Sequence, residues 1–214
     1  RLFLETMEVG ADGVVVTAEP ERLSEIAALR SRPPSVELVP LPVTRIEPLT
    51  VGDRVCVDTC SIMCPGEGLL VGSQSSCLFL ISSESVGSEY VACRPFRVNA
   101  GAVHAYVLTA DGRTKYLSEV KGGDELLAVT PEGASRTVVV GRAKIERRPL
   151  LLVEVDDGER RFSTIVQNAE TIRLVTEDGP VSVSELVPGH RVMVRLEEGG
   201  RHFGHSIDET ITER

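Results

Sequence analysis

From about Thr44 to the end of the chain, short apolar runs rich in Val, Leu and Ile alternate with polar turn residues. The runs are "RVCVD", "CLFLIS", "YVAC", "AVHAYVLT", "ELLAVT", "TVVVGR", "LLLVEV", "FSTIVQ", "TIRLVT" and "RVMVRL". The segments "ADG", "PEG", "DDG", "EDG" and "EEGG" separate them, and these residue types are typical of turns. The pattern predicts a mainly β domain over residues 35–214.

Residues 1–34 have a different pattern. "LFLETMEVGADGVVV" indicates the end of a helix, a turn and a buried strand, Val14–Val16, and "EPERLSEIAALRSR" indicates a short helix. We expect these residues to be the tail end of a truncated N-terminal α/β domain whose earlier strands are absent. The chain starts at Arg1 without an initiator Met, which fits a fragment or a processed form. The following "PPSVELVPLPVTRIEPLTVGD" is rich in proline and suits a linker or an edge strand.

Three segments of the β-rich part resemble one another: "PLTVGDRVCV", "LSEVKGGDELLAV" and "VSELVPGHRVMV". Each has a glycine followed by Asp or His and then an alternating strand, with the glycines at Gly52, Gly123 and Gly189. We interpret each glycine as a tight turn with positive φ that leads into a curved sheet. The fold predicted is therefore barrel-like, with repeated Gly-Asp-strand elements. Unrelated Gly-Asp turns that happen to precede strands are the alternative.

Composition narrows the classes of partner. The net charge of −9 argues against nucleic acid or an anionic membrane, since both require a basic face. No apolar stretch approaches the roughly 20 residues that span a bilayer, and from the acidic N-terminal residues we expect no signal peptide. Five cysteines without secretory context indicate a cytoplasmic protein. A homo-oligomer stays open.

The cysteines do not have a usual metal-ligand spacing. Cys56, Cys60 and Cys64 are four residues apart, which would suit a metal only on a helix, and Pro65 opposes one. We therefore predict buried structural thiols for all five: Cys56, Cys60, Cys64, Cys77 and Cys93.

A glycine-rich stretch, "PGEGLLVG", follows the strand Arg54–Val57. A dinucleotide-binding fingerprint would need a helix next, but "SQSSCLFLIS" indicates a strand. A loop with free backbone N–H groups at Gly66, Gly68 and Gly72 could still hold a phosphate or carboxylate. A structural turn is the alternative.

The stretch "RPFRVNAGAVHAYV" places polar groups where a core strand is expected. Arg97 offers a planar fork for a carboxylate or phosphate, and His104 could move a proton near neutral pH. We expect a hairpin at the Ala-Gly pair to bring Arg97 and Asn99 close to His104, on one face with Ala102. A core histidine is the alternative.

Three further polar groups interrupt the strands. "QNAET" carries amides and a carboxylate that either fasten loops or recognise a polar ligand. "GRAKIERRP" adds Lys144 and Arg148, with Glu146 as an ion-pair partner and Arg148 on a solvated face. "RHFGH" contains His202 and His205, which could bind a metal with Glu67 or Glu84.

Several of these segments together resemble the type II 3-dehydroquinate synthases: "VGDRVCVDTCSIMCPGEGLLVGS", "RPFRVNAGAVHAYV", "KYLSE", "VGRAKIERRPLLLVE", "STIVQNAETIRLV" and "RHFG…ETI". The resemblance implies an enzyme that acts on a small, anionic, linear amino-keto acid. Archaeal members carry out an NAD-dependent oxidative deamination and ring closure to 3-dehydroquinate. A bacterial branch uses manganese and a phosphorylated substrate to make 3-amino-4-hydroxybenzoate. The sequence leaves three functions possible: synthesis of either product, or a non-catalytic binding or assembly module.

The resemblance and the chemistry of the side chains together give expected roles. Catalytic roles are expected for His104, Lys144 and Glu119. Substrate contacts are expected from Arg94, Arg97, Asn99, Gln167, Asn168, Glu170 and Arg201. NAD contacts are expected from Gly66, Gly68, Gly72 and Ser73. If the chain belongs to the manganese-dependent branch, a divalent metal such as Mn²⁺ is expected at Glu67, Glu84 and His202.

Overall fold

The chain divides into two compact units, Arg1–Pro34 and Ser35–Arg214. The computed structural model describes residues 19, 22–23, 35–87, 92–197, 200–202 and 205–207, the last two segments by their backbone only. Of the predicted end of an α/β unit in residues 1–34, the described part is residues 19 and 22–23, of which Arg22 and Leu23 are helical, within the predicted short helix. None of the helical segments in these ranges has the length and apolar character of a membrane span.

The second unit is mainly β, as the alternation of apolar and polar residues predicts. One 3-10 turn, η1 (Leu117–Glu119), interrupts its strands. The strands are β1 (Val39–Thr59), β2 (Gly68–Gln74), β3 (Cys77–Ser82), β4 (Arg97–Ala102), β5 (Tyr106–Leu108), β6 (Thr114–Tyr116), β7 (Glu125–Val129), β8 (Ser135–Asp156), β9 (Arg161–Gln167), β10 (Arg173–Thr176), β11 (Gly179–Ser182), β12 (Arg191–Leu196), β13 (Gly200–His202) and β14 (His205–Ile207).

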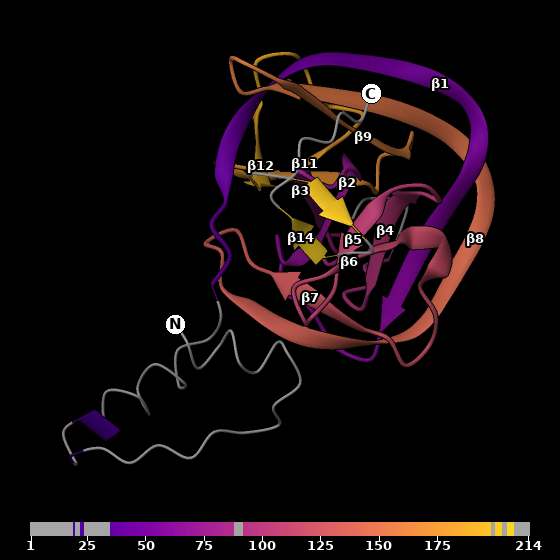
Figure 1. Ribbon diagram of the computed structural model, residues 1–214. Helices are drawn as coiled ribbons and strands as arrows, with labels where there is room; N and C mark the ends of the chain where they lie inside the picture. The colour runs from indigo at the N-terminus through magenta and orange to yellow at the C-terminus, as the bar shows by residue number, and fades with distance from the viewer. Residues whose placement is uncertain are drawn as a thin grey trace. The chain divides into compact units, whose positions relative to one another are not determined.

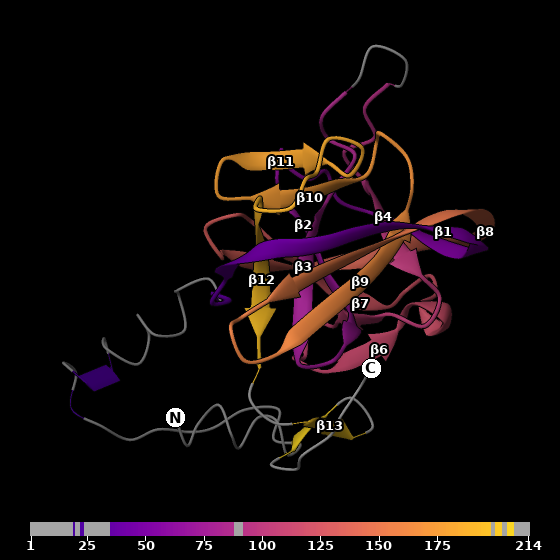
Figure 2. The same cartoon turned by 90° about the horizontal axis from the view of Figure 1, so that it is seen from above.

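Hydrogen bonding in the main sheet runs in a ring. The order β3-β12-β1-β8-β7-β2 returns to its start because β2 also pairs with β3. The two longest strands, β1 and β8, are antiparallel and curve together around the other strands (Figure 1). β4 adds to β1 and β9 adds to β8, and Figure 2 shows β1, β8 and β9 crossing the same side of the unit.

The core lies inside this ring. Residues that alternate along each strand point inward and are fully buried, for example Val55 and Val57 on β1, Phe79 on β3 and Val153 on β8. Apolar burial of this extent is the main favourable term in folding. On β3 the alternate residues Leu78 and Leu80 are buried as well, in a second apolar cluster, whereas on β1 the alternate residues Arg54 and Asp58 are polar.

The proline-rich segment predicted as a linker or edge strand is part of β1. Pro40 and Pro42 pair with β12, and Pro48 pairs with Leu151 of β8 just before the register shifts at Val51. A proline lacks the backbone N–H, so it is tolerated in a strand mainly at edges and irregularities. β1 pairs with β12 over Val39–Pro42 and with β8 from Val43 onward. Pro40 and Pro42 therefore lie before the pairing with β8 begins, and Pro48 lies at an irregularity of that pairing.

Two of the three predicted Gly-Asp turns are found. Gly123 and Gly189 have φ of 91° and 98° and precede β7 and β12. Gly52 instead lies within β1, and a Cβ there would come within 2.6 Å of Leu150 Cδ1. The prediction of a turn at Gly52 is therefore wrong, and side-chain packing accounts for this glycine.

Candidate anion-binding site

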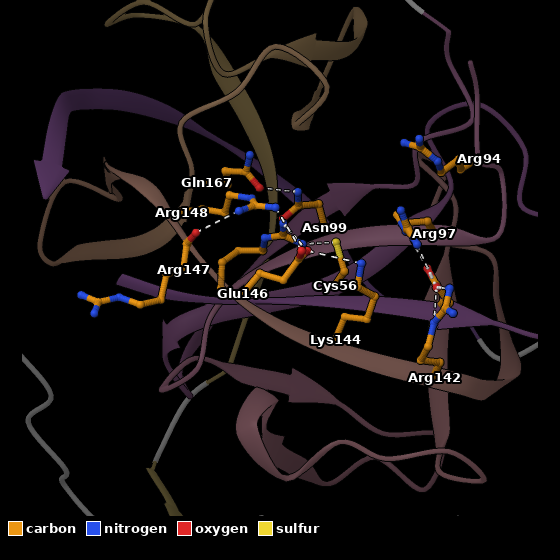
Figure 3. A network of polar contacts seen from close by, with 12 residues as sticks. Cys56, Arg94, Arg97, Asn99, Arg142, Lys144, Glu146, Arg147, Arg148 and Gln167 are labelled. Carbon is orange, nitrogen blue, oxygen red and sulfur yellow. Dashed lines mark hydrogen bonds and ion pairs between the residues drawn. The ribbon is translucent and has the colours of Figure 1, made fainter. Parts of the chain in front are cut away.

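Three adjacent strands share a polar outer face. β1 is flanked by β4 on one side and by β8 on the other. Because side chains alternate between the faces of a strand, Arg54, Cys56 and Asp58 share one face of β1, while Val55 and Val57 enter the core. Figure 3 shows the polar side chains of the three strands gathered over this face, with Arg147 directed away from them.

A cavity of about 320 Å³ lies on this face. Its lining contains five cationic and two anionic side chains, a formal excess of three positive charges in a chain of net charge −9. The lining residues are Arg54, Cys56, Glu84, Arg94, Arg97, Asn99, Lys144, Glu146, Arg148, Gln167 and Thr171. A cavity of this charge favours an anionic ligand.

Glu146 of β8 forms ion pairs with three of the cationic side chains. Its carboxylate accepts from Arg54 Nη2 at 3.1 Å and from Arg148 Nη2 at 3.0 Å, and it lies 3.5 Å from Lys144 Nζ. The Arg54 side chain is 5% exposed, whereas the Lys144 and Arg148 side chains are 40% and 43% exposed. Lys144 and Arg148 therefore present charge to a ligand in the cavity, and Arg54 lies beneath them.

Asp58 fixes the other side of the cavity. Its Oδ1 accepts from Arg97 Nε at 2.6 Å, and its Oδ2 accepts from Arg97 Nη2 at 2.9 Å and from Arg142 Nε at 2.9 Å. Burial acts to raise the pKa of Asp58, but the hydrogen bonds from the two guanidinium groups outweigh it, and the pKa is lowered. The fork predicted to clamp a substrate at Arg97 is thus largely occupied by Asp58. The substrate contact predicted for Arg97 stays a prediction.

This ion pair predicts a pH-dependent stability. Because the pKa of Asp58 is lower in the folded chain than in the unfolded one (about 3.9), its contribution is present above about pH 4 and is lost as the pH falls further. Asp58→Asn should cost about 3 kcal/mol at pH 7 and should reduce the loss of stability between pH 5 and pH 2. Urea unfolding at several pH values measures both.

Glu177→Gln is the matched control, since the Glu177–Arg191 pair is about half exposed on both sides. It should change the unfolding free energy by less than about 1 kcal/mol. An Asp58→Asn chain with the pH profile of the original chain would contradict the prediction.

Cys56 occupies the middle of the cavity floor. Its Sγ accepts a hydrogen bond from Arg54 Nη1. Burial raises the pKa of the Cys56 thiol, and the charge of Arg54 only partly offsets this. The group is therefore a neutral thiol near neutral pH. Cys56 and Cys77 are buried as predicted, but Cys60, Cys64 and Cys93 are exposed, so the prediction of five buried thiols is wrong for these three.

Sequence reasoning located about half of the lining. Of the predicted substrate contacts, the cavity brings together Arg94, Arg97, Asn99 and Gln167, together with the predicted catalytic residue Lys144. The predicted ion pairing of Glu146 is confirmed. The lining residues that carried no prediction of a ligand role are Arg54, Cys56, Glu146, Arg148 and Thr171. Arg148, expected on a solvated face, is 43% exposed, and alternation along β8 puts it on the face of Lys144, where it lines the cavity.

The structure does not bring His104 to this cavity. Gly101 and Ala102 still belong to β4, and the turn is at Val103–His104. The strands on either side of this turn do not form the predicted hairpin, because β4 pairs with β1 and β5 pairs with β2 and β6. His104 is thus exposed at the end of the strand remote from Arg97, and its Nε2 lies 3.2 Å from Ser73 Oγ. Partial burial lowers the pKa of His104. The prediction that the hairpin places His104 beside Arg97 and Asn99 is wrong.

Other predicted residues also lie outside the cavity lining. Glu119 is exposed in η1, and its carboxylate accepts from the backbone N–H of Tyr116 at 3.4 Å. Asn168 and Glu170 are exposed beyond the end of β9. Arg201 lies in β13, and its side chain is outside the described residues. The roles predicted for these residues stay predictions.

The glycine-rich stretch is a strand rather than a loop from Gly68 onward. Gly68 pairs with Ser82 and Val129, and Gly72 pairs with Tyr106. A Cβ at Gly68 would lie 1.8 Å from the Ile81 carbonyl oxygen, and one at Gly72 would lie 2.1 Å from the Cys77 carbonyl oxygen. The expected row of free N–H groups is therefore wrong for both glycines, which instead allow β2 to approach β3 closely.

The carboxylates predicted to bind a metal are held by arginine. Glu67 Oε1 accepts from Arg136 Nε at 2.6 Å, and Glu84 Oε2 accepts from Arg94 Nη1 at 3.2 Å. The side chain of His202, in β13, is outside the described residues. Among the described residues, no group of three or more His, Cys, Asp or Glu side chains could hold a metal ion.

Comparison with known proteins adds the family. Residues 40–214 match the profile described as the 3-dehydroquinate synthase II C-terminal domain. Proteins named 3-dehydroquinate synthase from Methanocorpusculum labreanum and Methanothermobacter thermautotrophicus are both 57% identical to it, over 100% of this chain and over 63% and 58% of their own lengths. That of Methanothrix thermoacetophila is 54% identical, over 100% of this chain and 60% of its own length. The chain thus spans about six tenths of these curated relatives. No solved structure matches it.

Proposed function

The chain belongs to the 3-dehydroquinate synthase II family, and from this premise we propose that the cavity on β4, β1 and β8 binds the substrate of a 3-dehydroquinate synthase. The substrate is a linear seven-carbon amino-keto acid, which the whole protein deaminates oxidatively and closes to a six-membered ring. The observation that carries the proposal is the excess of three positive charges around a cavity of about 320 Å³. That volume is at the lower end of the range for small-molecule sites, roughly 300–1,000 Å³.

The exposed ends of Arg148 and Lys144 are proposed to receive the negative charge of the substrate. Both already share Glu146, so their positions are fixed before a ligand arrives. An arginine carries five N–H donors. Arg148 uses one at Nη2 for Glu146 and one at Nη1 for the Arg147 carbonyl, so further N–H groups remain for a ligand. Arg94 extends the cationic lining from the side of Glu84.

Lys144 is proposed to polarise the carbonyl group of the substrate. Imine formation, the other role predicted for it, needs a neutral amine in an apolar enclosure. Lys144 is instead 40% exposed and lies beside the carboxylate of Glu146. A fixed cation that meets developing negative charge on oxygen is a strong contribution to catalysis.

NAD is proposed as the oxidant of the deamination, in which it would accept hydride. Gly68 and Gly72 do not fit the phosphate cradle expected at Gly66, Gly68, Gly72 and Ser73, because both are packed against the backbone of β3. We therefore assign no step to NAD through these residues. A metal does not fit Glu67 and Glu84 either, since both carboxylates are paired with arginine. No observation specifically favours the manganese-dependent aminohydroxybenzoate reaction.

The direct test offers the full-length protein the linear amino-keto acid with NAD⁺ and follows absorbance at 340 nm and release of ammonia. Arg148→Met should raise KM about tenfold to a hundredfold, because a charge-assisted hydrogen bond to the substrate is lost. Arg161→Met is the matched control, since the Arg161 side chain is 77% exposed and outside the cavity lining. Absence of both NADH and ammonia with the full-length protein would refute the proposal.

A further inference from the structure

Two polar atoms in the cavity lining are buried without a partner. Arg54 and Asn99 are 4% and 5% exposed. Among the described residues, Arg54 Nε, a donor, and Asn99 Oδ1, an acceptor, make no hydrogen bond. More than nine tenths of buried polar groups in native proteins are partnered. A ligand that supplies an acceptor and a donor would satisfy these two atoms of the cavity lining.

The neighbours of each residue determine which atom is left over. Asn99 Nδ2 donates to Gln167 Oε1 at 2.9 Å, which leaves Oδ1 free. Arg54 donates from Nη1 to Cys56 Sγ and from Nη2 to Glu146 Oε2, which leaves Nε free. Figure 3 shows the contact between Asn99 and Gln167 above the group around Glu146, with Cys56 beside both.

The strand register places an acceptor and a cation on opposite sides of the floor. Cys56 is the register partner of Asn99 on β4 and of Lys144 on β8. Two strand spacings separate Asn99 from Lys144, roughly 10 Å between their backbones. Glu84 adds a carboxylate on the β4 side, where its backbone N–H donates to the Arg97 carbonyl at 2.8 Å.

We propose that this floor is a subsite for the amino-acid end of the substrate, in which Arg54 Nε donates to the carboxylate and Asn99 Oδ1 accepts from the amine. This inference rests on the proposed function and adds Asn99 as the residue that recognises the amine of the substrate. A ligand with acceptor groups only would leave Asn99 Oδ1 unpartnered, and a wholly cationic ligand is opposed by the excess positive charge. A ligand group with a carboxylate and an amine supplies an acceptor for Arg54 Nε and a donor for Asn99 Oδ1.

The test measures equilibrium binding to the full-length protein without NAD⁺, so that no turnover occurs. The ligands are the linear amino-keto acid and the same compound with hydrogen in place of the amine. The original protein should bind the amino compound about tenfold to a hundredfold more tightly. Asn99→Leu should remove this preference, and Asn99→Asp, which keeps an acceptor at the position, should retain it. Arg161→Lys, outside the lining, should leave the preference unchanged.

Thermal unfolding of each variant establishes that it is folded before binding is measured. Equal binding of the two ligands by the original protein overturns the inference, as does a folded Asn99→Leu protein that keeps the preference. Loss of the preference in Asn99→Asp also overturns it, because the facing atom would then be the amide N–H. If the full-length protein turns over the substrate in these cases, the proposed function stands. Absence of both binding and turnover refutes the proposed function and this inference with it.

Discussion

Lys144→Met is expected to lower kcat of the full-length protein about 10²–10³-fold, with a smaller change in KM. A fixed cation that stabilises developing charge on a carbonyl oxygen contributes about this much. The methionine keeps most of the side-chain volume but removes the charge that lies 3.5 Å from Glu146. Initial rates of NADH formation across substrate concentrations separate kcat from KM.

Two further variants make the Lys144 prediction specific. Lys144→Arg keeps the charge and should retain activity to within about tenfold of the original protein, whereas an essential imine would not survive this change. Lys121→Met is the matched control, since Lys121 is exposed and outside the cavity lining. A Lys144→Met protein with unaltered kcat would remove Lys144 from the proposed chemistry.

Gly68→Ala is expected to destabilise the fold by at least about 4 kcal/mol, in the exceptional range for a single substitution. The added methyl group would lie 1.8 Å from the Ile81 carbonyl oxygen and 2.9 Å from Ser82 Cα. These are backbone atoms of the partner strand, so the two strands must separate. Because the pairing of β2 with β3 closes the hydrogen-bonded ring, the loss extends beyond one contact. Urea unfolding measures the change.

Gly112→Ala is the control for the glycine prediction. Gly112 has φ of +82°, and a Cβ there meets no heavy atom within 4 Å. Only the backbone cost of a left-handed alanine remains, about 1–2 kcal/mol. Equal stability of the Gly68→Ala and Gly112→Ala proteins would show that the approach of β2 to β3 is not the constraint.

The β character of the second unit could be predicted because the core strands alternate or run continuously apolar between clear turn residues. The extent of β1 and β8 could not. β1 continues through Pro40, Pro42 and Pro48, which local propensity assigns to a linker. Its pairing with β12 and with the distant β8 determines its length, and long-range pairing is not encoded in a local window.

The cavity could be predicted where polar residues interrupt an apolar strand, as at Arg97 and Asn99. Arg54 was missed because "RVCVD" was treated as an ordinary strand. The alternation of apolar and polar residues in this segment does predict the face. The valines enter the core, so Arg54, Cys56 and Asp58 share the other face of the strand. His104 was misplaced because the turn lies at Val103–His104, three residues beyond the predicted Ala-Gly pair, so that His104 stands in the turn and not on a strand.

The floor of the cavity is assembled from parts of the chain that are distant in sequence. Arg54 and Glu146, which contact each other there, are 92 residues apart. Closing a loop of this length is slow and entropically costly. The floor can therefore form only when most of the chain between Arg54 and Glu146 has folded. A ligand that recognises this floor therefore binds the native state and not the unfolded chain. Its presence should raise the unfolding temperature of the protein as a whole, in proportion to the logarithm of its concentration.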